Sequence, residues 1–159
     1  MNRNRARAPL AVLAAATLVA LAGCTGSDPA PQDLLSRLAD DPTSQDAVDP
    51  RVVPAEADPA STRWLGESDG VRFYAATGAS GEEPAVCLLV VVPGASAGDD
   101  GGGSACSRVR DFEASGTTLD LMLLDMADVS AALVPDGGTP HEELPSITPN
   151  LYAEVSRDA

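Results

Sequence analysis

Three residue types in the second half of the chain follow the order of a serine-hydrolase triad. Residues 94–98 read G-A-S-A-G, which matches the pattern around a nucleophilic serine, here Ser96. Asp125 or Asp136 and then His141 come later in the chain. The serine of such a site needs a helix directly after it, whereas residues 99–103 are two aspartates and three glycines, which disfavour a helix. We therefore predict no enzyme, and hydrolysis by Ser96 is the least favoured alternative.

Acidic residues form two candidate metal-binding groups. Asp99 and Asp100 lie in a glycine-rich stretch whose oxygen atoms could recruit Ca²⁺, and His141 precedes Glu142 and Glu143. The first group lacks the spaced carboxylates of a calcium-binding loop, and the second lacks a third ligand at helical spacing. We interpret both as solvated acidic loops and predict no metal and no cofactor.

Two of the three cysteines suit a disulfide. Cys87 lies in the apolar run 85–92, and Cys106 follows a glycine-rich loop over 94–103. A bond between them would close a loop of about twenty residues, worth roughly 3 kcal/mol in the chain-entropy model. A metal site would need more ligands than the single histidine offers, and a catalytic thiol would need a basic partner. A structural Cys87–Cys106 disulfide is the favoured interpretation.

The N-terminus has the features of an export signal. Arg3, Arg5 and Arg7 precede an apolar run over 10–22, which is too short to span a membrane as a helix. Residues 21–24 read L-A-G-C, which resembles the bacterial lipobox. That resemblance implies cleavage after residue 23 and attachment of palmitate-type acyl chains to Cys24, on the extracytoplasmic face of the cell membrane. Two or three chains make such an anchor stable.

The charge of the chain restricts its partners. It carries 24 acidic residues against ten basic ones, for a net charge of −14, and every basic residue is an arginine. Loss of residues 1–23 removes three arginines and no acid, which takes the charge to −17. Chemistry that needs a lysine is excluded, and nucleic-acid binding is not expected because phosphate backbones would be repelled. Basic or cation-bearing targets suit this surface better.

Composition divides the exported chain into two parts. Residues 24–60 lack aromatic residues and are rich in Pro and Asp, which indicates a lipidated N-terminus and flexible tether. The spacing over 33–40 is compatible with a short amphipathic helix, for which docking on the domain is slightly favoured over transient formation. All five aromatic residues follow, which places a globular domain at 61–157. Among them Trp64 and Tyr74 could form a sugar-stacking platform, but core packing is favoured.

The pattern within 61–157 predicts an α+β, mostly β fold: a small antiparallel sheet with one or two short helices. Residues 61–66 and 71–77 flank a turn sequence and suggest a hairpin. Residues 85–92 are apolar on both faces, as a central strand should be. Further strands are predicted at 117–125, 128–134 and 150–156, and a helix at 104–113.

The domain also resembles a group of uncharacterised small extracytoplasmic lipoproteins of high-GC Gram-positive bacteria. The likeness covers about residues 62–156. Five segments account for the resemblance: a strand (72–76), a cysteine-bearing apolar strand (86–90), a second cysteine (104–106), a V-P-D-G turn (132–137) and a closing strand (150–153). The stretch 137–149 is longer than the usual connection. The likeness brings no activity, and by analogy with the outer parts of membrane-anchored regulators it implies a sensing role.

These observations favour one function over its alternative. We expect a lipid-anchored, disulfide-bonded interaction module without catalytic activity, whose partner is an envelope protein or another envelope component. The alternative is a small-ligand or metal-binding lipoprotein that serves a transporter or sensor.

Overall fold

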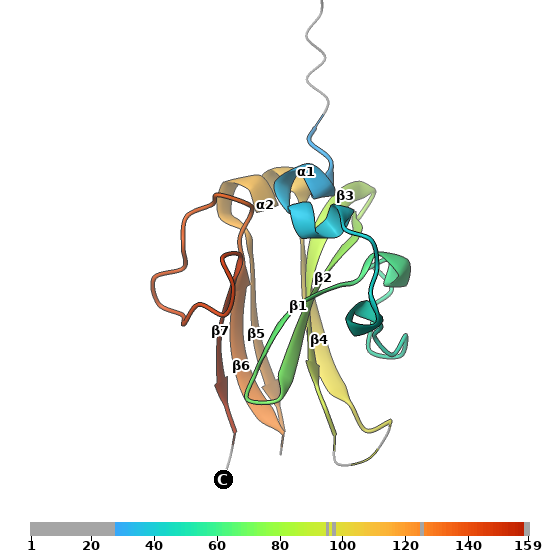
Figure 1. The fold of residues 1–159 in the computed structure, drawn as a ribbon, viewed down its shortest axis with the longest axis vertical. Coiled ribbons are helices and arrows are strands. Elements are labelled where there is room, and N and C mark those ends of the chain that lie inside the picture. The colour runs from blue at the N-terminus through green and yellow to red at the C-terminus, as the bar shows by residue number, and fades with distance from the viewer. Residues whose placement is uncertain (1–27, 95, 97, 125, 158–159) are drawn as a thin grey trace, which may run out of the picture.

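Two antiparallel sheets face each other as a β-sandwich (Figure 1). The structure is a computed structural model that describes residues 28–94, 96, 98–124 and 126–157. The first sheet has the strand order β1-β2-β3-β4 and the second β5-β6-β7. The predicted class, mostly antiparallel β with short helices, is confirmed, although the strands form two sheets where we expected one.

The first sheet is a meander that begins with the predicted hairpin. Its strands are β1 (Arg63–Ser68), β2 (Val71–Ser80), β3 (Glu83–Val92) and β4 (Gly101–Arg108). Asp69 and Gly70 connect β1 and β2 with φ angles of 47° and 75°. A two-residue hairpin turn of type I′ needs this positive φ at both positions, which is why the Asp-Gly pair occurs there.

The interior strand β3 is placed as predicted, but its neighbour is not. From Ala85 to Val92 every residue of β3 is buried, and β2 and β4 flank it. The helix predicted over 104–113 is wrong in its first half, because β4 runs to Arg108 and α2 spans only Val109–Ser115. The glycine-rich loop we expected over 94–103 likewise ends early, since its last three glycines are in β4.

The second sheet follows α2 and contains β5 (Thr117–Leu123), β6 (Ala127–Leu133) and β7 (Leu151–Ser156). All three strands fall where the alternation of apolar and polar residues places them. The last strand pairs antiparallel with β6, Leu133 opposite Leu151, despite the long connection before it.

The main core lies between the two sheets. Phe73 and Leu88 of the first sheet are fully buried there with Leu133 and Leu151 of the second. The leucines of β5 pack against this cluster, as their alternation predicts. Burial of such side chains is worth about 1.5–3 kcal/mol each, so this contact between the sheets is the main source of stability.

Residues 28–60 are part of the folded domain, which corrects the tether predicted for them. The segment contains α1 (Pro31–Leu34) and the 3₁₀ helices η1 (Ser36–Ala39), η2 (Ser44–Asp46) and η3 (Pro59–Ser61). Leu35 is fully buried in the main core and Leu38 is nearly so. The helical spacing over 33–40 thus marks a docked segment, formed by two short helices rather than one.

The rest of this segment, residues 40–60, covers the outer face of the first sheet and is called the covering layer below. Val48, Val52 and Val53 pack against a second cluster that includes Tyr74 and Leu89. The segment is held at its end by backbone hydrogen bonds to β2, from Asp58 N to Thr77 O at 2.8 Å and from Ala79 N to Glu56 O at 2.9 Å. The interior strand β3 is therefore covered on both faces from Ala85 to Val92.

Candidate functional site

The two inner cysteines form the predicted disulfide. Cys87 in β3 and Cys106 in β4 are register partners, and their sulfur atoms are bonded. Cys87 is fully buried on the outer face of the first sheet, in the cluster that residues 48–57 cover. The bond joins an interior strand to an edge strand under a covering layer, which is a structural role.

The residues of the candidate hydrolase triad are not brought together as far as the structure describes them. Ser96 follows β3 in the loop toward β4, and the chain continues into a strand instead of the helix that the serine would need. Asp136 lies beyond β6, where its carboxylate accepts hydrogen bonds from Ser36 N at 2.8 Å and Asn150 Nδ2 at 3.0 Å. These bonds keep the pKa of Asp136 below its usual range although burial opposes ionisation. Asp125 lies outside the described residues.

The structure places the two acidic groups considered for metal binding in loops. Asp100 accepts a hydrogen bond from Gly94 N at 3.1 Å and pairs with Arg72 at 3.3 Å, so it closes the β3–β4 loop. Glu142 and Glu143 are exposed. Over residues 28–157, apart from the three that the structure leaves out, His, Cys, Asp and Glu form no group that could hold a metal ion.

Trp64 of β1 and Tyr74 of β2 pack against each other on the outer face of the first sheet, beneath the covering layer. Their ring centroids lie 5.5 Å apart at an interplanar angle of 76°, an edge-to-face contact. Tyr74 is only 2% exposed, and its burial raises the pKa of the phenol. Because Tyr74 is buried and Trp64 is only partly exposed, the pair offers no stacking platform of two exposed rings, and core packing is confirmed for Tyr74.

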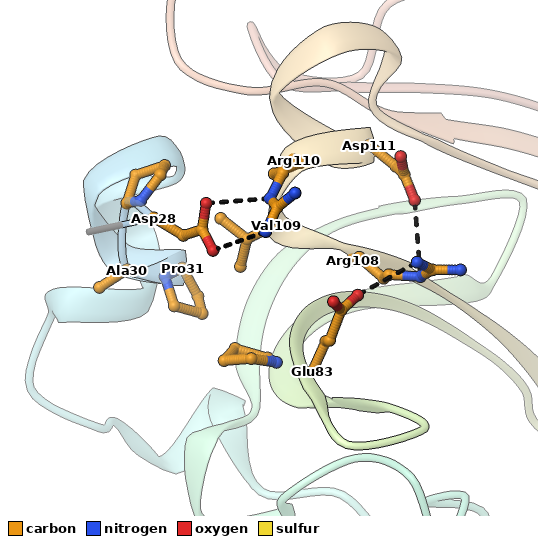
Figure 2. A pocket seen from close by; sticks show the side chains of 10 residues that line it. Asp28, Ala30, Pro31, Glu83, Arg108, Val109, Arg110 and Asp111 are labelled. Carbon is orange, nitrogen blue, oxygen red and sulfur yellow. Dashed lines mark hydrogen bonds and ion pairs between the residues drawn. The ribbon is translucent and has the colours of Figure 1, made fainter. Parts of the chain in front are cut away.

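A cavity of about 350 Å³ lies where the chain enters the domain (Figure 2). Its walls are residues 28–31, the start of β3, and the junction of β4 with α2. Arg110 binds both carboxylate oxygens of Asp28, at 2.9 and 3.1 Å, and Arg108 pairs with Glu83 at 3.1 Å. The first described residues are thus tied to α2 across this cavity.

The chemistry of this cavity is that of paired surface charges. Each side chain of the Arg110–Asp28 and Arg108–Glu83 pairs is more than half exposed, and exposed pairs contribute at most about 1 kcal/mol each. The cavity has the volume of a small-ligand site, but both arginines are already neutralised. A ligand would have to displace an existing carboxylate.

The outer face of the second sheet differs from that of the first, because much of it is uncovered. Leu144 covers the part of this face around Ala132 and Tyr152. Toward the β5–β6 turn the outward side chains are exposed, and at that end lie Met122, 74% exposed, and Leu124, 85% exposed. Large hydrophobic side chains with this exposure occur nowhere else among the described residues.

Exposed carboxylates lie on the same face of the sheet as Met122, and Leu124 follows in the turn beyond β5. Asp120 of β5, Asp128 of β6 and Glu154 of β7 are exposed on the same face. We define the distal acidic face as Asp120, Met122, Leu124, Asp128 and Glu154. Our sequence analysis missed this surface, although a large apolar residue at 122, on the polar side of a strand that alternates, is a signal that could have found it.

The chain matches no family model, no curated protein and no solved structure.

The predicted lipidation site lies next to the described part of the molecule. Cys24 and the predicted signal peptide, 1–23, are outside the described residues, and the described chain begins at Asp28, four residues after Cys24. No helix in the described part is long and apolar enough to cross a membrane.

Proposed function

We propose that this protein is a lipid-anchored interaction module on the extracytoplasmic face of the cell membrane, without catalysis of its own. Acyl chains on Cys24 would hold it at the membrane. The distal acidic face would contact a partner protein of the envelope. The observation that supports this function is the exposure of Met122 and Leu124 at 74% and 85% in a domain that otherwise buries its large apolar side chains.

The position of this face suits a protein that is held by its N-terminus. The helix α1, which begins three residues after Asp28, lies at one end of the sandwich, and the β5–β6 turn lies at the other (Figure 1). The seven residues of β5 span roughly 20 Å at about 3.3 Å per residue. An anchor at Cys24 would therefore present the distal acidic face away from the lipid surface.

Site-specific photocrosslinking in the native cell tests this function. A photoreactive amino acid at position 124 should give a discrete protein adduct, because the side chain there points into the interface. The same amino acid at Ala55, which is exposed on the covering layer of the first sheet, should not. Absence of any protein adduct at 124 would contradict the interaction function.

The cavity beside Asp28 supports a second candidate, a small-ligand lipoprotein that serves a transporter or sensor. A ligand with a carboxylate could replace Asp28 on Arg110, since a planar guanidinium binds carboxylates in this two-bond geometry. Binding would raise the melting temperature of the protein, and the rise would be lost in Arg110→Ala. Unchanged melting temperatures across small carboxylates and cell-wall fragments would contradict it.

A further inference from the structure

The distal acidic face is an ordered array on a rigid sheet. Met122 is paired with Asp128, and Asp120 is paired with Ser130, across β5 and β6. Ser130 also lies opposite Glu154 of β7. The Ser130 hydroxyl donates a hydrogen bond to Asp120 Oδ1 at 2.8 Å, which fixes that carboxylate. Backbone pairing therefore sets the positions of all three acids.

These three carboxylates lack a cationic neighbour within the described chain. The ion pairs there use seven other acidic residues, and none involves Asp120, Asp128 or Glu154. Arg157 follows β7, but its guanidinium lies by the β1–β2 turn. Its Nη2 atom is 3.3 Å from the position that a Cβ on Gly70 would occupy. The charge of this face is uncompensated.

Uncompensated carboxylates at this spacing repel one another. Asp128 is diagonal to both Asp120 and Glu154, and diagonal neighbours lie about 7–8 Å apart in a sheet. This separation is no larger than the Debye length of about 8 Å at physiological ionic strength, so salt screens the repulsion only partly. A cationic partner would remove it.

We propose that the distal acidic face binds a cationic, partly apolar segment of a partner protein. Arg or Lys side chains of that segment would pair with Asp120, Asp128 and Glu154. An apolar side chain between them would bury Met122 and Leu124. This inference rests on the proposed interaction function and specifies the chemistry of its partner.

Two other occupants fit the face less well. The carboxylates form no group that could hold a metal ion within the described residues, so a bound cation is not favoured. A membrane surface is not favoured either, because anionic lipids attract basic segments and repel acidic ones. A protein segment with separate cationic side chains matches carboxylates that are spread over three strands.

The test compares two triple variants of the full-length, membrane-anchored protein with the photoreactive group at 124. One neutralises the face, Asp120→Asn with Asp128→Asn and Glu154→Gln. The control neutralises three exposed acids elsewhere, Glu56→Gln with Glu82→Gln and Glu113→Gln, so the net charge of the two variants is equal. All six side chains are exposed, and matching melting temperatures would verify that both variants fold.

We expect the face variant to lower the adduct yield at least about tenfold and the control variant to leave it unchanged. The yield from the wild type should fall as salt is raised, and the crosslinked peptide should contain Arg or Lys beside an apolar residue. Equal yields from the two variants would overturn the cationic partner while leaving the interaction function standing. Absence of any adduct at 124 would overturn both. A melting temperature that rises with millimolar Ca²⁺ in the wild type, but not in the face variant, would make the face a cation site instead.

Discussion

The buried carboxylate of Asp46 accepts a hydrogen bond from the backbone N–H of Trp64 at 2.6 Å. Asp46 ends η2 in the covering layer, and Trp64 lies in the edge strand β1, so this bond fastens the layer to the sheet. Thr43 N at 2.6 Å, Thr43 Oγ1 at 2.8 Å and Arg37 Nη2 at 3.1 Å donate to the same carboxylate. One side chain that is 3% exposed thereby satisfies donors from three segments of the chain.

Asp46→Asn should lower the free energy of unfolding by about 1–3 kcal/mol, because an amide cannot accept from all of these donors and loses the charge. Asp41→Asn, five residues earlier in the same segment and exposed to solvent, is the matched control and should leave stability unchanged. Urea unfolding at pH 7 checks both variants. Equal effects would contradict the role of Asp46 as the anchor of the covering layer.

The same carboxylate should make stability depend on pH in the acid range. Burial favours the neutral form of Asp46, but the hydrogen bonds from Trp64 and Thr43 and the charge of Arg37 prevail and lower its pKa below that of an ordinary aspartate. A group whose pKa is lower in the folded state stabilises the fold fully above its unfolded pKa of about 4, and that contribution is lost as pH falls through the folded pKa. The difference in unfolding free energy between the wild type and Asp46→Asn should therefore shrink below about pH 4. A constant difference from pH 7 to pH 2 would contradict this.

Leu35→Ala tests whether the N-terminal segment belongs to the core. Leu35 is fully buried between the sheets, and truncation of such a leucine costs about 2–5 kcal/mol. Gln32→Ala, on the exposed side of α1, should change the unfolding free energy little. Thermal unfolding of the two variants provides the comparison, and a Leu35→Ala variant as stable as the Gln32→Ala control would restore the tether interpretation.

Removal of the disulfide should cost about 3 kcal/mol, the entropy of closing a loop of roughly twenty residues. The double variant Cys87→Ala, Cys106→Ala should unfold at lower urea concentration than the wild type, and reductant should shift the wild type but not the double variant. If reductant leaves the wild-type transition unmoved while the thiols are shown to be free, the bond does not contribute to stability.

Gly78 marks the closest approach of the covering layer to the sheet. A Cβ at this position would overlap the carbonyl oxygen of Glu56 and come within 2.8 Å of Cys87 Sγ. Gly78→Ala should therefore destabilise the domain by about 1–3 kcal/mol. Ala79→Ser, one residue along and exposed, is the control. A Gly78→Ala variant of wild-type stability would show that residues 56–58 do not hold this position.

Sequence patterns predicted the strands whose side chains alternate or are wholly apolar. Residues 71–77, 85–92 and 117–123 carry that signal, and the spacing of the cysteines predicted their bond. The strand β4 gave no such signal, because a run of glycines has no side chains to alternate. A Cβ at Gly101 would lie 3.1 Å from Leu123 Cδ1, and a Cβ at Gly103 would lie 2.8 Å from Leu121 Cδ1. Because glycine has no Cβ, β5 can pack closely against β4. The register with β3, rather than β4's own sequence, defines this strand.

The covering layer was missed for a different reason. Val48, Val52 and Val53 follow neither a helical nor a strand period, and the prolines around them resemble a linker. Yet a strand that is apolar on both faces needs cover on both, and the strand over 85–92 already implied a second layer. The alternation along 117–123 marks Met122 as out of place, but its grouping with Asp128 and Glu154 on neighbouring strands required the cross-strand register, which spacing along one strand does not provide.

The membrane-anchored state is tested most directly by the intact mass of the protein purified from native membranes in detergent. The predicted result is a chain that begins at Cys24 and carries diacylglyceryl on its thiol, with Cys24→Ala released from the membrane fraction. Recovery of the full chain from Met1, unacylated and outside the membrane fraction, would contradict it.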